Sequence, residues 1–209
     1  LSNVVSLNII IGLLFMAVAL TYIDPILYFF GASANTLPYA KEYIRIILYG
    51  NIITHLYFGL NAAMRSTGSP KKAMGLTIFT VILNAILDPI FIFTLDMGIA
   101  GAAWATVIAQ SVSLIVVMMH FSNHERAVHF KKGILRLNFK IAKESLAIGA
   151  GPFLMNAAAC LVTLFINQQL RTYSGDLGIG AYGICNRIIF MFIMICMGLN
   201  QGMQPIAGY

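Results

Sequence analysis

Long apolar runs recur along this chain and restrict what it can fold into. A helix needs about 20 apolar residues to cross a bilayer, and runs of about that length cover residues 4–30, 40–64, 73–95, 99–121, 142–170 and 179–203. Charged residues make up only 10% of the 209 and hydrophobic residues 59%, whereas an average soluble domain carries about 25% charged residues. We therefore predict an all-α integral membrane protein, a polytopic helical bundle with six transmembrane helices.

The basic residues gather in alternate connections between these runs. Nine of the thirteen Lys and Arg residues lie between or beside the second and third runs or the fourth and fifth runs, whereas Glu42, Asp96 and Asp176 lie in or beside the opposite connections. The positive-inside rule places the basic connections in the cytoplasm. We expect a multi-pass protein of the inner (plasma) membrane, with both ends of this chain cytoplasmic. Because topology accounts for the net charge of +6, no nucleic-acid partner is expected.

The connection from Ser122 to Lys143 is the only long polar segment, and it predicts how the chain is organised. We expect a four-helix part over residues 1–121, a cytoplasmic loop over residues 122–141 and a two-helix part over residues 142–209. The remaining connections are short, which makes successive helices antiparallel neighbours.

Asp88 is an acid inside the third apolar run. An ionised acid at mid-membrane costs about 3 kcal/mol, so such residues normally face a polar cavity, an ion pathway or a partner. Asn84 precedes Asp88 by one helical turn and shares its face. Pro89 has no amide hydrogen to give Ala85, which frees that carbonyl beside the acid. The alternative is a helix that simply ends at Asp88 and Pro89 near the outer interface.

Thr106 in the next run favours a polar site over that alternative. The two runs are antiparallel across a short turn, with Asp88 ten residues before Gly98 and Thr106 eight residues after it. The two side chains are therefore expected at similar depth. Together with Asn84 they predict a group of oxygen ligands inside the membrane.

Other polar and small residues inside the runs have less specific interpretations. Arg187 must find an acid, a carbonyl or water at its depth, and Asn156 is a candidate for a cavity-lining amide. His55 is either a hydrogen-bonded packing residue or a proton carrier. Close helix packing is predicted at small residues, and these are Gly12, Gly59, Gly98, Gly101, Ala102, Ala103, Ala105 and Ala109.

Motifs for nucleotide binding, zinc binding or ATP hydrolysis are weak or absent in the sequence. Gly178, Gly180 and Gly183 match a dinucleotide pattern, but no strand precedes them. His124 and His129 have the wrong spacing for a zinc helix, and there is no Walker sequence. The three cysteines are interpreted as small buried hydrophobic residues. We therefore expect neither an enzyme nor a bound cofactor.

Several segments together resemble the multidrug and toxic compound extrusion (MATE) transporters. They are residues 60–72, residues 84–89, residues 98–110, Gly151 with Pro152, and residues 201–209. The resemblance covers the whole chain and implies a twelve-helix exporter with two six-helix lobes. This chain then corresponds to family helices three to eight: the last four helices of the N-terminal lobe, the inter-lobe loop and the first two helices of the C-terminal lobe. We accordingly interpret the chain, which begins with Leu1, as a fragment of a longer protein.

The resemblance also implies a cation site. Many bacterial and archaeal members use an Asn and an Asp on helix five, a Thr on helix six and an Asp on helix one. The first three correspond to Asn84, Asp88 and Thr106, which would also be the metal ligands if Na+ is the coupling ion, and the helix-one acid would lie before Leu1. Members of the NorM type carry a glutamate in helix seven, where this sequence has only Cys160 and apolar neighbours.

The function implied is multidrug efflux, in which cationic organic compounds leave the cell against Na+ or H+. Asn156 and Arg187 are candidates for the substrate cavity, membrane lipids are the surroundings, no cofactor beyond the coupling ion is expected, and the full-length protein is expected to be a monomer. A lipid or oligosaccharide-lipid flippase of the same superfamily is the alternative, and it predicts a groove richer in basic residues. A lipid-modifying enzyme would need clustered acids or histidines, and a scaffolding protein would leave the matched depth of Asp88 and Thr106 unexplained.

Overall fold

The computed structural model describes residues 1–32, 36–122, 128–130 and 137–207, and it divides into two compact units, residues 1–149 and 150–209. Within these described ranges the chain is helical and contains no strand. The elements are α1 (Ser2–Thr21), α2 (Ile23–Phe29), α3 (Leu37–Tyr49), α4 (Asn51–Ser66), α5 (Pro70–Pro89), the π-helix η1 (Ile90–Thr94), α6 (Gly98–Ser122) and α7 (Phe139–Ala207). The predicted all-α class is confirmed.

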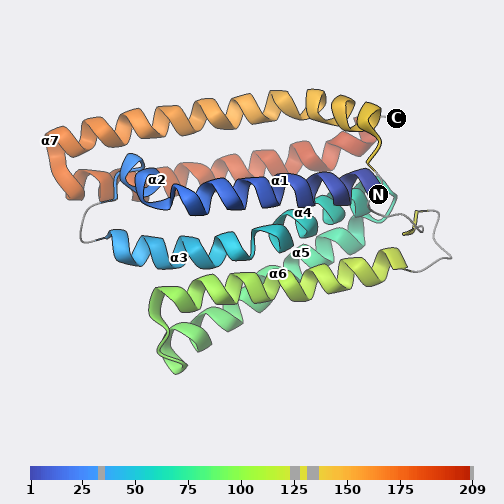
Figure 1. Ribbon diagram of the computed structural model, residues 1–209, viewed down its shortest axis with the longest axis horizontal. Helices are drawn as coiled ribbons and strands as arrows, with labels where there is room; N and C mark the ends of the chain where they lie inside the picture. The colour runs from blue at the N-terminus through green and yellow to red at the C-terminus, as the bar shows by residue number, and fades with distance from the viewer. Residues whose placement is uncertain (33–35, 123–127, 131–136, 208–209) are drawn as a thin grey trace. The chain divides into compact units, whose positions relative to one another are not determined.

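Five segments in the described ranges are long and apolar enough to cross a membrane by length and composition. They are Ser2–Thr21, Pro70–Thr94, Gly98–Ser122, Phe139–Leu170 and Leu177–Asn200. The predicted run over residues 40–64 is not one continuous helix, because it is divided at Gly50 into α3, with 13 residues, and α4, with 16. Figure 1 shows the two as consecutive helical segments.

Gly50, the residue at this break, lies against another helix. A Cβ atom added at Gly50 would come within 2.5 Å of Val107 on α6. Such a separation is too short for two carbon atoms, so any larger residue would push α6 away. A small residue at this position therefore allows a close contact between segments far apart in the sequence.

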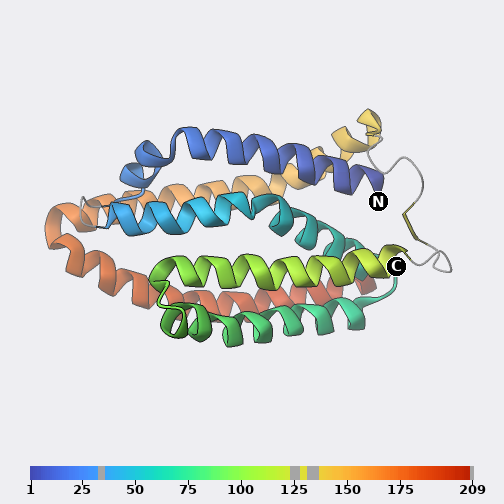
Figure 2. The same ribbon diagram turned by 60° about the horizontal axis from the view of Figure 1, so that its bottom comes forward.

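Helix α6 packs against α3, α4 and α5 in the first unit. Figures 1 and 2 show α5 and α6 side by side and antiparallel, as the short connection predicted. Small residues make the close approach possible, since Ala103, Ala105 and Ala109 are fully buried. Gly12 and Gly59 similarly face α4 and α1 respectively. Gly98 was predicted to pack but instead takes a positive φ of 54° at the turn, with no neighbour near its Cβ position.

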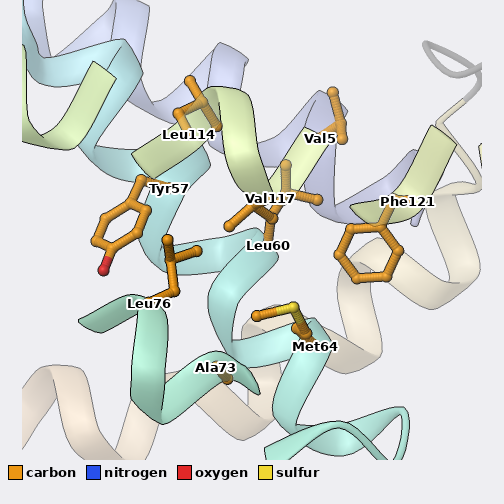
Figure 3. Close-up of a cluster of buried hydrophobic side chains, with 9 residues drawn as sticks. All are labelled: Val5, Tyr57, Leu60, Met64, Ala73, Leu76, Leu114, Val117 and Phe121. Atoms are coloured by element: carbon orange, nitrogen blue, oxygen red, sulfur yellow. The ribbon is translucent and has the colours of Figure 1, made fainter. Parts of the chain in front are cut away.

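An apolar core joins α1, α4, α5 and α6 at one end of the first unit. Figure 3 shows its nine buried side chains, which are Val5, Tyr57, Leu60, Met64, Ala73, Leu76, Leu114, Val117 and Phe121. Phe130, from the described part of the loop after α6, packs on this core, and its ring centroid lies 5.8 Å from that of Phe121. The core holds α5 and α6 together about three turns from Asp88, and so it fixes their register at the polar residues.

The second unit consists of the later part of α7. The helix is broken at Gly175, whose φ of 60° and ψ of −157° are not helical, and this break lies in the predicted connection between the last two runs. Cys160, Cys185 and Cys196 are free and exposed, so the interpretation of the cysteines as buried was wrong. The two arms of α7 are the helical stretches before and after this break, and the windows in them that qualify as membrane spans contain no buried residues. The predicted boundary over residues 122–141 lies partly outside the described residues and stays a prediction.

Candidate functional site

The helical segment that carries Asp88 continues past the proline, although α5 itself ends at Pro89. Residues Pro70–Thr94 form one span, in which α5 passes through Pro89 into η1. The amide of Leu95 donates to the carbonyl oxygen of Ile90 at 3.0 Å, the five-residue spacing of a π-turn. Asp88 therefore lies inside a longer helical span, six residues before its end at Thr94. Whether this level is close to the outer interface, as the alternative has it, stays a prediction.

Three polar side chains from α5 and α6 meet at this level. The amide nitrogen of Asn84 donates to a carboxylate oxygen of Asp88 at 3.1 Å and to the hydroxyl oxygen of Thr106 at 3.4 Å. All three side chains are half-buried. The helical period places Asn84 and Asp88 on one face of α5, and the antiparallel register brings Thr106 opposite them. We call these three residues the acceptor site.

Contact between the backbones of α6 and η1 supports this register. A Cβ atom added at Gly101 would lie 2.7 Å from the carbonyl carbon and oxygen of Phe91 and 3.1 Å from the amide nitrogen of Ile92. Only glycine allows α6 to lie so close to the π-turn. Gly101 precedes Thr106 by five residues, so the contact holds Thr106 near the acid.

The acceptor site has more oxygen acceptors than donors. The hydroxyl of Thr106 donates to the carbonyl oxygen of Ala102 at 3.0 Å, so its hydrogen is already used. No donor among the described residues reaches the second carboxylate oxygen of Asp88 or the side-chain carbonyl oxygen of Asn84. One negative charge with amide and hydroxyl oxygens is the ligand chemistry that hard cations prefer.

Softer metals have no comparable site in the part of the chain that the structure describes. A search there finds no group of three or more His, Cys, Asp or Glu side chains that could hold a metal ion. The acceptor site has a single carboxylate and no sulfur or imidazole, which disfavours zinc or copper. Its chemistry therefore fits a proton or an alkali cation best.

Comparison with known proteins shows what the chain as a whole is similar to. A family model for MatE matches residues 1–90. The multidrug export protein MepA of Staphylococcus haemolyticus (strain JCSC1435) is 30% identical over 202 residues, which is 97% of this chain and 44% of that protein. MepA of Staphylococcus aureus (strain MRSA252) is 31% identical over 97% of this chain and 45% of its own length. The chain thus spans about half the length of the curated relatives it matches.

Solved structures of MATE transporters also match this chain. An inward-facing conformation of a multidrug resistance MATE family transporter of the MOP superfamily matches with a TM-score of 0.82 and 26% identity, over 99% of this chain and 46% of that one. An outward-facing conformation matches with a TM-score of 0.85 and 26% identity, over 98% and 46% of the two chains. The chain is therefore similar to MATE transporters in both sequence and fold. The MATE relatives named here are described as transporters and export proteins, not as enzymes.

The two predicted cavity residues lie apart from the acceptor site in the sequence. Asn156 and Arg187 are exposed side chains on the two arms of α7 in the second unit. The amide of Asn156 donates to the carbonyl oxygen of Pro152 at 2.8 Å, one turn earlier on its own helix. The substrate-cavity role of both residues stays a prediction.

A first polar contact that was not predicted from the sequence is an ion pair between α2 and α3. Lys41 on α3 forms an ion pair with Asp24 on α2, with 2.7 Å between its ammonium nitrogen and the nearer carboxylate oxygen. Opposite charges at neighbouring ends of the first two apolar runs are the signal that could have indicated this pair.

The second unpredicted contact is a buried group of hydroxyls on α4, α5 and α6. Thr80 lies 2.9 Å from the hydroxyl of Tyr57 and 2.7 Å from that of Ser113, and it donates to the carbonyl oxygen of Leu76 at 2.7 Å. We call Tyr57, Thr80 and Ser113 the hydroxyl cluster. Because Thr80 has one hydrogen, which Leu76 receives, Tyr57 and Ser113 donate to Thr80. No sequence spacing indicates three separate helices meeting at this point.

His55 has the surroundings of a packing residue. It is half-buried on α4, and its ring lies 3.6 Å from the Cβ position of Gly12 on α1. The structure shows no hydrogen bond between His55 and another described residue. The packing role predicted for His55 therefore fits, but the hydrogen bond predicted with it is not found among those residues.

Proposed function

We propose that this chain is part of a multidrug efflux transporter that exports cationic organic compounds in exchange for Na+ or H+. The observation that carries the proposal is the acceptor site, a carboxylate with amide and hydroxyl oxygens inside a membrane span. The relatives named as multidrug export proteins support efflux as the activity. Because the chain spans about half of those relatives, the proposal concerns the intact protein that contains it.

The acceptor site provides the coupling by binding the ion. An ionised Asp88 inside a membrane is unfavourable, and a bound proton or Na+ neutralises it. The ion then favours whichever arrangement of the transporter binds it more tightly, and by no more than the difference in affinity between the two arrangements. Export of a cation is driven if the substrate and the ion favour opposite arrangements.

The experiment is the substitution Asp88→Asn in the intact protein, with ethidium efflux from energised cells or vesicles as the readout. An amide keeps the shape of the side chain and removes the charge. We expect gradient-driven efflux to be lost while the amount of folded protein in the membrane stays unchanged. Efflux at the unsubstituted rate would contradict the proposal.

Asp96→Asn is the matched control. Asp96 is an exposed acid eight residues further along, at the turn before α6, and its φ of 52° is one that asparagine tolerates well. The same chemical change at that site is expected to leave efflux unchanged. Imposing a Na+ gradient without a pH gradient, and then the reverse, identifies the coupling ion.

A further inference from the structure

A groove lies on the surface of the first unit between the ends of α4, α5 and α6, away from the acceptor site. Its volume is about 430 Å³, within the range of about 300–1,000 Å³ that is usual for small-molecule sites. Met64 and Leu76 are buried at its base, whereas Phe79 and Val116 are exposed at its sides. Figure 3 shows Met64 and Leu76 among the side chains of the buried core.

One end of this groove is basic. Lys72 and His120 line it there, in the first turn of α5 and the last turn of α6. The first turn of α5 contains no acid, and Lys72 makes no ion pair with any residue that the structure describes. The free amides at the start of α5 add positive potential. The apolar part extends along α5 from Lys72 to Phe79, a rise of about 10 Å.

We propose that this groove binds an anionic phospholipid, with its phosphate at Lys72 and one acyl chain between Phe79 and Val116. An apolar groove beside a candidate membrane span, with the lysine ammonium group at one end, matches the charge and polarity of such a molecule better than those of a soluble anion. Basic pockets between helices at the cytoplasmic side are the usual sites for anionic headgroups. The basic connection after α4 belongs to that side by the positive-inside rule.

Gly75 provides the space for the acyl chain. It is exposed, lines the groove, and would meet no atom within 4 Å if it carried a Cβ. A larger side chain at this position would enter the groove rather than the protein core. Since glycine is a poor helix former, replacing it with leucine is also compatible with α5.

The experiment uses the purified intact protein and phosphatidylglycerol with a photoreactive diazirine in one acyl chain. After illumination, mass spectrometry of peptides locates the adducts. We expect them within residues 75–79 and 116–120, and about fivefold fewer with the matched phosphatidylcholine, the factor expected for one lysine near a phosphate. Equal labelling by the two lipids, or adducts mainly elsewhere, would overturn the proposal.

Three variants and one competitor separate the contribution of the lysine charge from that of the space for the acyl chain. Lys72→Gln is expected to reduce labelling by phosphatidylglycerol to the level of phosphatidylcholine, whereas Lys71→Gln, one residue earlier and not lining the groove, leaves it unchanged. Gly75→Leu should abolish the adducts with all charges kept. Failure of Gly75→Leu to reduce labelling, an equal effect of the two lysine variants, or displacement of the lipid by glycerol phosphate would each overturn the proposal. Circular dichroism and size-exclusion elution confirm that each variant is folded.

Discussion

Two groups of polar side chains share α5 and α6, and they differ in how their hydrogen-bonding groups are used. In the hydroxyl cluster, Thr80 gives its hydrogen to Leu76 and accepts from Tyr57 and Ser113, so its oxygen is fully satisfied. In the acceptor site, Asp88 and Asn84 each keep an oxygen that no described donor reaches. The first group is buried and the second is half-buried.

This difference separates a structural role from a binding role. A saturated cluster has no free lone pair for a ligand, and its bonds stabilise the packing of three helices. A group with spare acceptors and a negative charge adds little to the stability of the fold by itself. It is strongly stabilised when it binds a cation. Thr80 and Asn84 are only one turn apart on α5, so substitutions at the two positions test the distinction directly.

The largest effect on stability is expected from Thr80→Val, which keeps the shape of the side chain and removes the oxygen. The buried hydroxyl of Tyr57 then has no acceptor, and we expect a loss of about 2–3 kcal/mol in the free energy of unfolding. Asn84→Ala, at the half-buried site, should cost only about 0.5 kcal/mol. Equilibrium unfolding in mixed micelles measures both. If Asn84→Ala destabilised the protein as much as Thr80→Val, the distinction would not hold.

A smaller loss of stability is expected from Gly101→Ala, which disturbs the close contact between α6 and η1 beside the acceptor site. The added methyl group collides with the backbone at Phe91, and overpacking of this kind costs about 1–2 kcal/mol. Because the collision moves α6 away from η1, the ion dependence of efflux should weaken as well. The control is Gly75→Ala on α5, where space is open and helix propensity predicts no loss. Normal ion dependence in Gly101→Ala would show that the close contact does not position Thr106.

The smallest effect is expected from Thr106→Val, which removes one oxygen from the acceptor site. We expect the apparent affinity for the coupling ion to fall about fivefold, equivalent to about 1 kcal/mol, with almost no change in stability. Thr106→Ser retains the hydroxyl and should stay close to the unsubstituted protein. The measurement is efflux rate against the concentration of the coupling ion. Equal weakening by valine and serine would mean that packing at Thr106, rather than its oxygen, matters.

Much of the acceptor site could be predicted because it depends on regular geometry. Asn84 and Asp88 share a face through the helical repeat, and Thr106 follows from counting residues across a short turn. The resemblance to MATE transporters pointed to the same three residues independently. The Asp24–Lys41 pair and the hydroxyl cluster were not predicted, since each joins helices whose relative rotation no local spacing defines.

The sequence by itself determined that the chain is a set of membrane-spanning helices, because apolar length and the exclusion of charge are local properties that a bilayer selects. It also determined that an acid, an amide and a hydroxyl lie at one level. Only the tertiary structure decided that the second run breaks at Gly50, where Val107 leaves no room for a side chain. It likewise decided that Thr80 is saturated while Asp88 is not, because hydrogen-bond partners on other helices are known only once those helices are packed.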